Sequence, residues 1–214
     1  MARVLILGAN GKIARLAEHI FVDTTDSDLR LYLRNAERLR DFADSHTLVE
    51  AVEGDTTDVQ TLIESMKDED LVYANLAGSN IESQARAVVQ AMHAEKKTRL
   101  VWISTLGIYD EVPGKFGEWN KKVLGDYITN YAAAAKVIED SDLDYTIIRP
   151  AWLTDKPEVD YEVTKKGEDF KGTEVSRRSI AQIVVDIAQD PDKYSRESIG
   201  VNKPNTDGDK PAWY

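Results

Sequence analysis

A short apolar segment that runs into a glycine turn and then into a helical pattern constrains this chain more than any other stretch. Val4–Leu7 is the kind of apolar run that forms a buried strand. Gly8 and Gly11 follow, and apolar residues then recur at helical spacing from Ile13 to Phe21. Strand, turn and helix therefore succeed one another without a linker, which predicts the start of an α/β unit.

This turn has the properties of a site for a dinucleotide pyrophosphate. A pyrophosphate requires free backbone N–H groups and the positive end of a helix dipole, and both lie where Gly11, Lys12 and Ile13 open the helix. Gly8 allows the tight turn, Gly11 lets the backbone approach the phosphates, and Ala14 is small enough for close packing on the strand. The alternative is that the glycines serve only a tight strand-to-helix turn.

The alternation of strand and helix continues along the chain. Strands are expected at 29–33, 48–52, 71–76, 100–105 and 144–148, with helices between them, including one long helix at 120–140. Since no hairpin signal interrupts this alternation, we predict an α/β fold: a single-domain, Rossmann-type, doubly wound parallel sheet with a small C-terminal substrate-side insert. The domain is expected to span 1–214, with a core at 1–152, the insert at about 153–176 (strand 161–164), a final helix and strand within 177–203, and a tail at 204–214.

The ends of the predicted strands indicate the cofactor. Units that bind NAD place an acidic residue at the end of the second strand, where it accepts hydrogen bonds from the ribose. Arg34 stands there instead and attracts a 2′-phosphate, so NADP(H) is favoured over NAD(H), unless Arg34 is only a solvated strand-end residue. Asn35 is expected to cap a short helix. Asp55 and Thr56 end the third strand and are expected to meet the adenine.

The composition excludes several classes of protein. A net charge of −11 and a pI of about 4.8 argue against a nucleic-acid surface, which requires clustered Lys and Arg. The chain has no cysteine, which excludes disulfides and thiolate chemistry, and we expect no metal site. No stretch approaches a membrane span, so we expect a cytoplasmic protein with a small-molecule partner, either a monomer or a homodimer.

A set of motifs, taken in order, carries a family resemblance. They are Gly8–Ala14, Leu31–Asn35, Glu53–Asp55, Ile103–Thr105 and Leu143–Pro150. Together they resemble the atypical short-chain dehydrogenases/reductases, specifically the NmrA-like group and the compact NADPH-dependent flavin reductase or biliverdin reductase B type, over about residues 1–203. The resemblance implies a Rossmann fold that binds NADP(H) through Gly8, Asn10, Gly11, Lys12, Ile13, Arg34, Asp55, Ala77, Gly78 and Ser104. Leu76 ends the strand before Ala77 and Gly78 and is included with them; the alternative for this stretch is a simple turn.

The chain departs from the wider superfamily at its catalytic pair. Typical members place a lysine four residues after a tyrosine, and the lysine lowers the pKa of the phenol that transfers the proton. Lys136 fits the lysine, but Ala132 stands four residues before it, and Tyr131 is about 140° around the helix by the geometry of about 100° per residue. We therefore expect Ser104 to orient the nicotinamide or the acceptor and Lys136 to hold ribose or phosphate; both are alternatively structural.

The turn-rich segment 106–119 reads as an active-site loop or lid. Tyr109, Trp119 and Trp152 are the candidate acceptor residues, although they can equally serve packing. The leading hypothesis is an oxidoreductase that transfers hydride from NADPH to a flat conjugated acceptor such as a flavin or quinone. The alternatives are an NmrA-like NADP(H) sensor without turnover and, third, a sugar-nucleotide epimerase or dehydratase.

Overall fold

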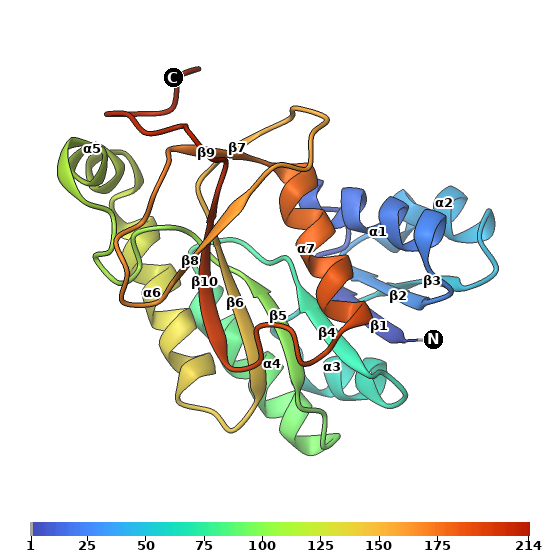
Figure 1. The fold of residues 1–214 in the computed structure, drawn as a ribbon. Helices are drawn as coiled ribbons and strands as arrows, with labels where there is room; N and C mark the ends of the chain where they lie inside the picture. Colours follow the sequence, from blue (N-terminus) through green and yellow to red (C-terminus); the bar gives the residue numbers. More distant parts are fainter. Residues whose placement is uncertain (1) are drawn as a thin grey trace.

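The fold is built on an eight-stranded sheet, seen in a computed structural model that describes residues 2–214 (Figure 1). The strand order is β3-β2-β1-β4-β5-β6-β10-β8, and every neighbouring pair is parallel except β10 with β8. The strands are β1 (Arg3–Leu7), β2 (Asp28–Leu33), β3 (Val49–Glu53), β4 (Leu71–Ala74), β5 (Arg99–Ile103), β6 (Asp144–Pro150), β8 (Glu162–Lys165) and β10 (Glu197–Asn202). The predicted doubly wound α/β fold is confirmed.

Helices cover both faces of the sheet, as the alternation of strand and helix requires. On one face α1 (Lys12–Thr24) packs beside α7 (Arg177–Gln189), with η1 (Ala36–Leu39) and α2 (Arg40–Asp44) at its edge. On the other face lie α3 (Val59–Met66), α4 (Ile81–Ala94) and α6 (Asp126–Glu139). Successive residues of β1 divide between the two cores: Val4 and Ile6 enter one and Leu5 and Leu7 the other.

The strand order reverses direction at β1, which lies between β2 and β4, and ligands of open α/β sheets bind in the crevice at such a point. The glycine turn enters this crevice and packs against the residue after β4. Gly8 has a φ of 73°, and a Cβ there would lie 2.4 Å from the carbonyl oxygen of Asn75. The turn therefore requires glycine at Gly8, whereas a Cβ on Gly11 would lie 2.0 Å from the Asn75 side-chain nitrogen and would force that amide to turn away.

The predicted long helix at 120–140 is two helices. Gly125, with φ 49° and ψ −126°, separates α5 (Gly114–Leu124) from α6, because this conformation is outside the range that continues a helix. The expectation of a loop through Trp119 is therefore wrong after Pro113. Gly117 reads as a loop residue in the sequence, but its lack of a side chain lets α5 pack on the carbonyl of Val112, 2.0 Å from where a Cβ would stand.

The segment after β6 contains more regular structure than its sequence indicates. The strand expected at 161–164 is present as β8, shifted by one residue, and forms the antiparallel edge. Two strands of three residues each, β7 (Trp152–Thr154) and β9 (Glu174–Ser176), pair in parallel as a separate small sheet above the main one. The tail is anchored where the backbone N–H of Thr173 donates to the carbonyl of Thr206 at 3.0 Å. Across residues 2–214, no helix has the length and apolar character needed to cross a membrane.

Candidate functional site

A hollow of about 320 Å³ opens where β1, β2, β3 and β4 end at the crevice. It brings together many of the residues expected to bind the cofactor: Gly8, Asn10, Gly11, Arg34, Asp55, Thr56, Leu76 and Ala77. Its wall also contains residues that sequence reasoning did not select, namely Tyr32, Arg38, Asn75, Asn80 and Gln84. The remaining cofactor candidates, Lys12, Ile13, Gly78, Ser104 and Lys136, lie outside this lining and are described below.

The first turn of α1 is open to an anion. Gly11 precedes the helix in an extended conformation, no side chain caps the helix there, and its first turn contains no acidic residue. The free N–H groups and the positive end of the helix dipole therefore remain available to a phosphate. Ile13 is buried beneath this turn, whereas Lys12 is exposed and lies 3.6 Å from Asp155. Arg177 also contacts Asp155, at 2.7 Å, so this carboxylate is held beside the anion site by two cations.

Arg34 and Arg38 lie together at the end of β2, on a turn held by a neighbouring strand. Glu53 of β3 accepts hydrogen bonds from the backbone N–H groups of Asn35 at 2.8 Å and Ala36 at 2.7 Å. These bonds lower the pKa of Glu53. The expectation that the Asn35 side chain caps the helix is wrong, because Asn35 adopts a left-handed conformation and Glu53 does the capping. In the described chain neither arginine has a carboxylate within 4.0 Å, which leaves both free for an anionic ligand.

The opposite wall of the hollow is a network of hydrogen bonds. Thr56 donates to the Gln84 side-chain oxygen at 2.7 Å, and the Gln84 amide donates to the carbonyl of Ala77 at 3.1 Å. Asp55 accepts from the backbone N–H of Thr57 at 2.9 Å and from its hydroxyl at 2.7 Å, and these bonds lower the pKa of its carboxyl group. The network joins the ends of β3 and β4 and fixes the width of the hollow.

Ser104 lies beyond the hollow, directly after β5. Its backbone N–H donates to the carbonyl of Ile148 at 2.8 Å, which fixes the residue beside β6. Its hydroxyl is buried and has no hydrogen-bond partner among residues 2–214. A buried hydroxyl without a partner is costly, so this group fits a ligand that completes its bonding. Together with the open helix terminus and the free arginines, it makes the crevice a suitable cradle for a dinucleotide.

Two tyrosines one turn apart occupy the face of α6 that points toward the site. The Tyr131 hydroxyl donates to the carbonyl of Leu76 at 3.2 Å, and the Tyr127 ring stacks on the Tyr131 ring at 4.2 Å. Burial raises the pKa of Tyr131 well above its usual range. Tyr127 and Tyr131 thus form a stacked pair four residues apart, and Tyr131 reaches the wall of the hollow at Leu76.

Lys136 is not brought into the site. Its side chain is 74% exposed and its ammonium group lies 2.8 Å from Asp140, on the outer surface of α6. The physical reason is the helical geometry: five residues after Tyr131, which points inward, a side chain points away from the sheet. Gly78 lies at the start of the turn before α4, near the hollow. A Cβ on Gly78 would have the Asn80 side chain as its nearest neighbour.

Trp119 and Trp152 lie together above the carboxyl edge of the sheet. Their ring centroids are 4.8 Å apart, and the Trp152 indole N–H donates to the buried Asn120 side chain at 2.9 Å. Two further rings from the tail, those of Trp213 and Tyr214, rest on them. We name these four residues the aromatic group.

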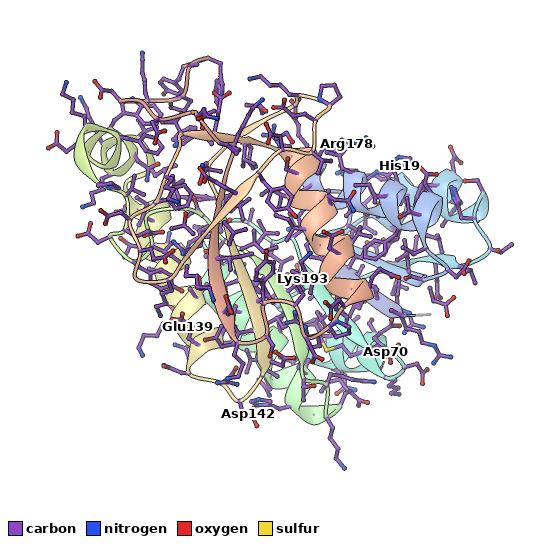
Figure 2. The ribbon with its side chains drawn as sticks, in the orientation of Figure 1. His19, Asp70, Glu139, Asp142, Arg178 and Lys193 are labelled. Carbon is purple, nitrogen blue, oxygen red and sulfur yellow. The ribbon has the colours of Figure 1, made fainter. Side chains whose placement is uncertain are left out.

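Tyr109 does not join the aromatic group. Its hydroxyl donates to Glu139 at 2.7 Å and contacts Ser198 at 3.1 Å. Figure 2 shows Glu139 near the far end of α6, well away from the tail at the top of the same view. The Tyr109 ring is covered by the cationic group of Lys166, 4.2 Å from its centroid. The structure therefore assigns Tyr109 to packing between α6 and β10.

The segment 106–112 is fixed in place, in contrast to the lid expected there. Glu111 and Arg149 form a fully buried ion pair. Glu111 also accepts hydrogen bonds from the backbone N–H groups of Gly107 at 3.0 Å and Tyr109 at 2.9 Å. The guanidinium of Arg149 completes its bonding on Ser198 of β10 at 3.1 Å. A segment tied by a buried ion pair to two strands is part of the scaffold. In the described part of the chain, no group of three or more His, Asp or Glu side chains is arranged to hold a metal ion.

Comparisons with known proteins agree with this geometry. The model of the NAD(P)H-binding family matches residues 8–191. A Rossmann-fold NAD(P)-binding family protein from Shigella flexneri is 39% identical, with a TM-score of 0.83, over 99% of this chain and 98% of that chain. A short-chain dehydrogenase/reductase (wide type) from Veillonella parvula, solved in complex with NADP, is 29% identical with a TM-score of 0.92 over 99% of each chain.

A Bacillus subtilis protein described as an uncharacterized sugar epimerase is 25% identical over 194 residues, 86% of each chain. The resemblance to short-chain dehydrogenases/reductases found in the sequence motifs is thus confirmed. The chain belongs to the NAD(P)H-binding family and has the Rossmann fold of the short-chain dehydrogenases/reductases.

Proposed function

We propose that this protein is an NADPH-dependent oxidoreductase whose acceptor is a flat conjugated molecule such as a flavin or quinone. The observation that carries the proposal is that Lys136 lies on the outer surface of α6, paired with Asp140, while the side chain of that helix that reaches the wall of the hollow is Tyr131. Burial raises the pKa of Tyr131, and Lys136 points away from this phenol and does not counter the effect. Flavins and quinones need mainly close placement beside the reductant, and solvent supplies their proton.

The cofactor supplies a hydride from its nicotinamide C4, and with one proton from solvent the acceptor is reduced by two electrons while NADP⁺ is left. The chain contributes binding and orientation. Gly11, Lys12 and Ile13 hold the pyrophosphate at the start of α1, and Arg34 and Arg38 hold the 2′-phosphate. The unpartnered Ser104 hydroxyl orients the nicotinamide or the acceptor. Trp119 and Trp152 of the aromatic group receive the acceptor.

The cofactor preference is tested by titrating the protein with NADPH and with NADH while following coenzyme fluorescence. Arg34→Gln and Arg38→Gln each remove one charge-assisted contact, worth about 1.5–3 kcal/mol, so each should weaken NADPH binding by roughly 10–150-fold. NADH binding should change by less than about twofold, because NADH lacks the 2′-phosphate. Arg86→Gln, an exposed arginine on α4, is the matched control. Equal losses for the two coenzymes would refute the assignment.

Turnover is tested in the same cuvette with a panel of acceptors. NADPH oxidation with riboflavin, FMN or naphthoquinones supports the enzyme, whereas tight NADPH binding with no oxidation across the panel supports the sensor. The name of the Bacillus subtilis relative keeps sugar-nucleotide epimerisation as a second candidate. Conversion of a UDP-hexose with bound NADP⁺ would support that candidate and refute the proposal, since such chemistry requires a phenolate that this site does not favour.

A further inference from the structure

The two tail rings of the aromatic group cover surfaces that a flat ligand would use. Tyr214 meets the Trp119 ring edge-on, with centroids 4.8 Å apart at 81°, and meets the Trp152 ring at 5.7 Å and 72°. Trp213 lies 6.2 Å from Trp152. An edge covers only part of an indole face, while a parallel fused ring covers more of it. The Phe116 ring stacks on Trp119 at 6.0 Å and 20° from within α5, so the surface open to a ligand is the part of Trp119 and Trp152 that the tail rings cover at steep angles.

These two indoles lie beside the edge of the sheet at which β5 and β6 end. Trp152 follows β6 after a single residue, and the carbonyl of Pro150 accepts a hydrogen bond from the backbone N–H of Leu106 at 3.3 Å. Ser104, two residues before Leu106, bonds to Ile148 in the same way. The unpartnered Ser104 hydroxyl and the Trp152 indole thus come from the adjacent ends of β5 and β6.

The tip of the tail is held by its rings alone. Closer to the body the tail is bonded firmly, since the Thr173 hydroxyl donates to the carbonyl of Thr206 at 2.7 Å. Beyond Pro211, the hydrogen bonds found within residues 2–214 stay inside the tail: Tyr214 N–H donates to Pro211 at 3.1 Å and Lys210 donates to the Tyr214 carbonyl. The side chains of Trp213 and Tyr214 are 52% and 54% exposed. An anchored base with a weakly held tip allows the tip to move independently.

We propose that Trp213 and Tyr214 are a displaceable occupant of an acceptor-stacking site formed by Trp119 and Trp152. The ligand class is a planar, electron-poor fused ring system of the isoalloxazine or naphthoquinone type, because indole faces are electron-rich and prefer such partners. This inference rests on the proposed function for the identity of the ligand. It adds that the chain itself competes with the acceptor for the site.

The first test measures riboflavin binding with saturating NADP⁺, which cannot reduce the flavin. Riboflavin fluorescence reports stacking on tryptophan. When the tail rings occupy the site, the apparent affinity for riboflavin falls by the fraction of molecules in which the site is free. Three aromatic contacts of about 0.5 kcal/mol each correspond to about tenfold. Trp213→Ala/Tyr214→Ala should therefore bind riboflavin about tenfold more tightly, whereas Tyr214→Phe, which keeps the ring, should match the parent. Equal or weaker binding by the double variant, or no riboflavin binding at all, would overturn the proposal.

The second test detects the displacement itself. The chain has no cysteine, so a spin label on Ala212→Cys reports only the tail tip. Riboflavin should increase the mobility of the label, and Trp119→Leu, which removes one of the two indoles of the stacking site, should abolish that response. A label whose mobility does not change when riboflavin binds would contradict the displacement. If riboflavin releases the tail but does not oxidise NADPH, the proposed reductase is refuted and this inference stands. If riboflavin is reduced without releasing the tail, the reductase stands and this inference is refuted.

Discussion

Replacing Glu18 with glutamine should stabilise this protein at alkaline pH and leave it little changed at acid pH. Glu18 lies on the buried face of α1 with a fully buried side chain. One carboxylate oxygen pairs with Arg15, and the other is buried without a partner. The hydroxyl of Tyr73 is also buried and unpartnered. Burial raises the pKa of Glu18 from 4.5 to about 7, although Arg15 opposes the rise.

The sign follows from the protons bound in each state. Between pH 4.5 and 7 the folded protein binds a proton at Glu18 that the unfolded chain has released, so this group lowers the free energy of unfolding as pH rises. The loss begins near the unfolded pKa and is complete above the folded pKa. Integrated from pH 5 to pH 8, the raised pKa corresponds to a loss of about 2.5 kcal/mol, at 1.36 kcal/mol per pKa unit. A glutamine side chain does not titrate, so the Glu18→Gln variant does not lose this part of the free energy of unfolding as the pH rises.

Urea unfolding of parent and variant at pH 5 and pH 8 measures the effect. For each protein, the free energy of unfolding at pH 5 is subtracted from that at pH 8, and the two results are compared. The constant cost of weakening the Arg15 pair and the titration of other groups cancel in this comparison. A difference of about 2.5 kcal/mol corresponds to roughly 5–10 °C in melting temperature for a chain of this size. Glu64→Gln, an exposed change on α3, should follow the parent. If Glu18→Gln also parallels the parent across this range, the raised pKa is refuted.

Three further changes test the rest of the architecture. Gly11→Ala should weaken NADPH binding at least about tenfold and cost about 1–3 kcal/mol of stability, because its Cβ would lie 2.0 Å from the Asn75 side chain. Parent-like values in a coenzyme titration and a urea melt would contradict the close approach of Gly11 to Asn75. Asp155→Asn should tighten NADPH binding about threefold at low salt by freeing Lys12 for the phosphates, and the gain should disappear near 0.5 M salt; a gain that is independent of salt would exclude this explanation. Glu111→Gln leaves a fully buried guanidinium without its counter-charge and should cost about 3–5 kcal/mol in urea unfolding, with a cost below about 1 kcal/mol being inconsistent with the buried pair.

The cofactor half of the site could be predicted from the sequence because its determinants are local. Gly8 and Gly11 stand within one strand-turn-helix unit, and Arg34 stands at the end of a strand whose length is evident from its apolar run. Arg38 and Gln84 were missed because each reaches the hollow from a helical segment, where a polar side chain in the sequence is indistinguishable from one that faces solvent.

The acceptor half depends on long-range geometry that periodicity does not encode. Gly125 alone divides the stretch from 114 to 139 into two helices, and a glycine inside a helical pattern is usually tolerated. Once that break is known, Tyr127 lies in the first turn of α6 and stacks on Tyr131 four residues later, while Lys136 lies on the outer surface. Tyr214 reaches Trp119 from about 95 residues away in sequence, a contact that no local pattern indicates.

The crevice is divided along the chain as well as in space. Every residue that lines the cofactor hollow comes from the first 84 positions, and the aromatic group comes entirely from position 119 onward. Under the proposed function, substitutions from position 119 onward would change the acceptor without changing the residues that line the hollow. The residues of the hollow and those of the aromatic group come from separate parts of the chain, so one set can diversify while the other stays the same.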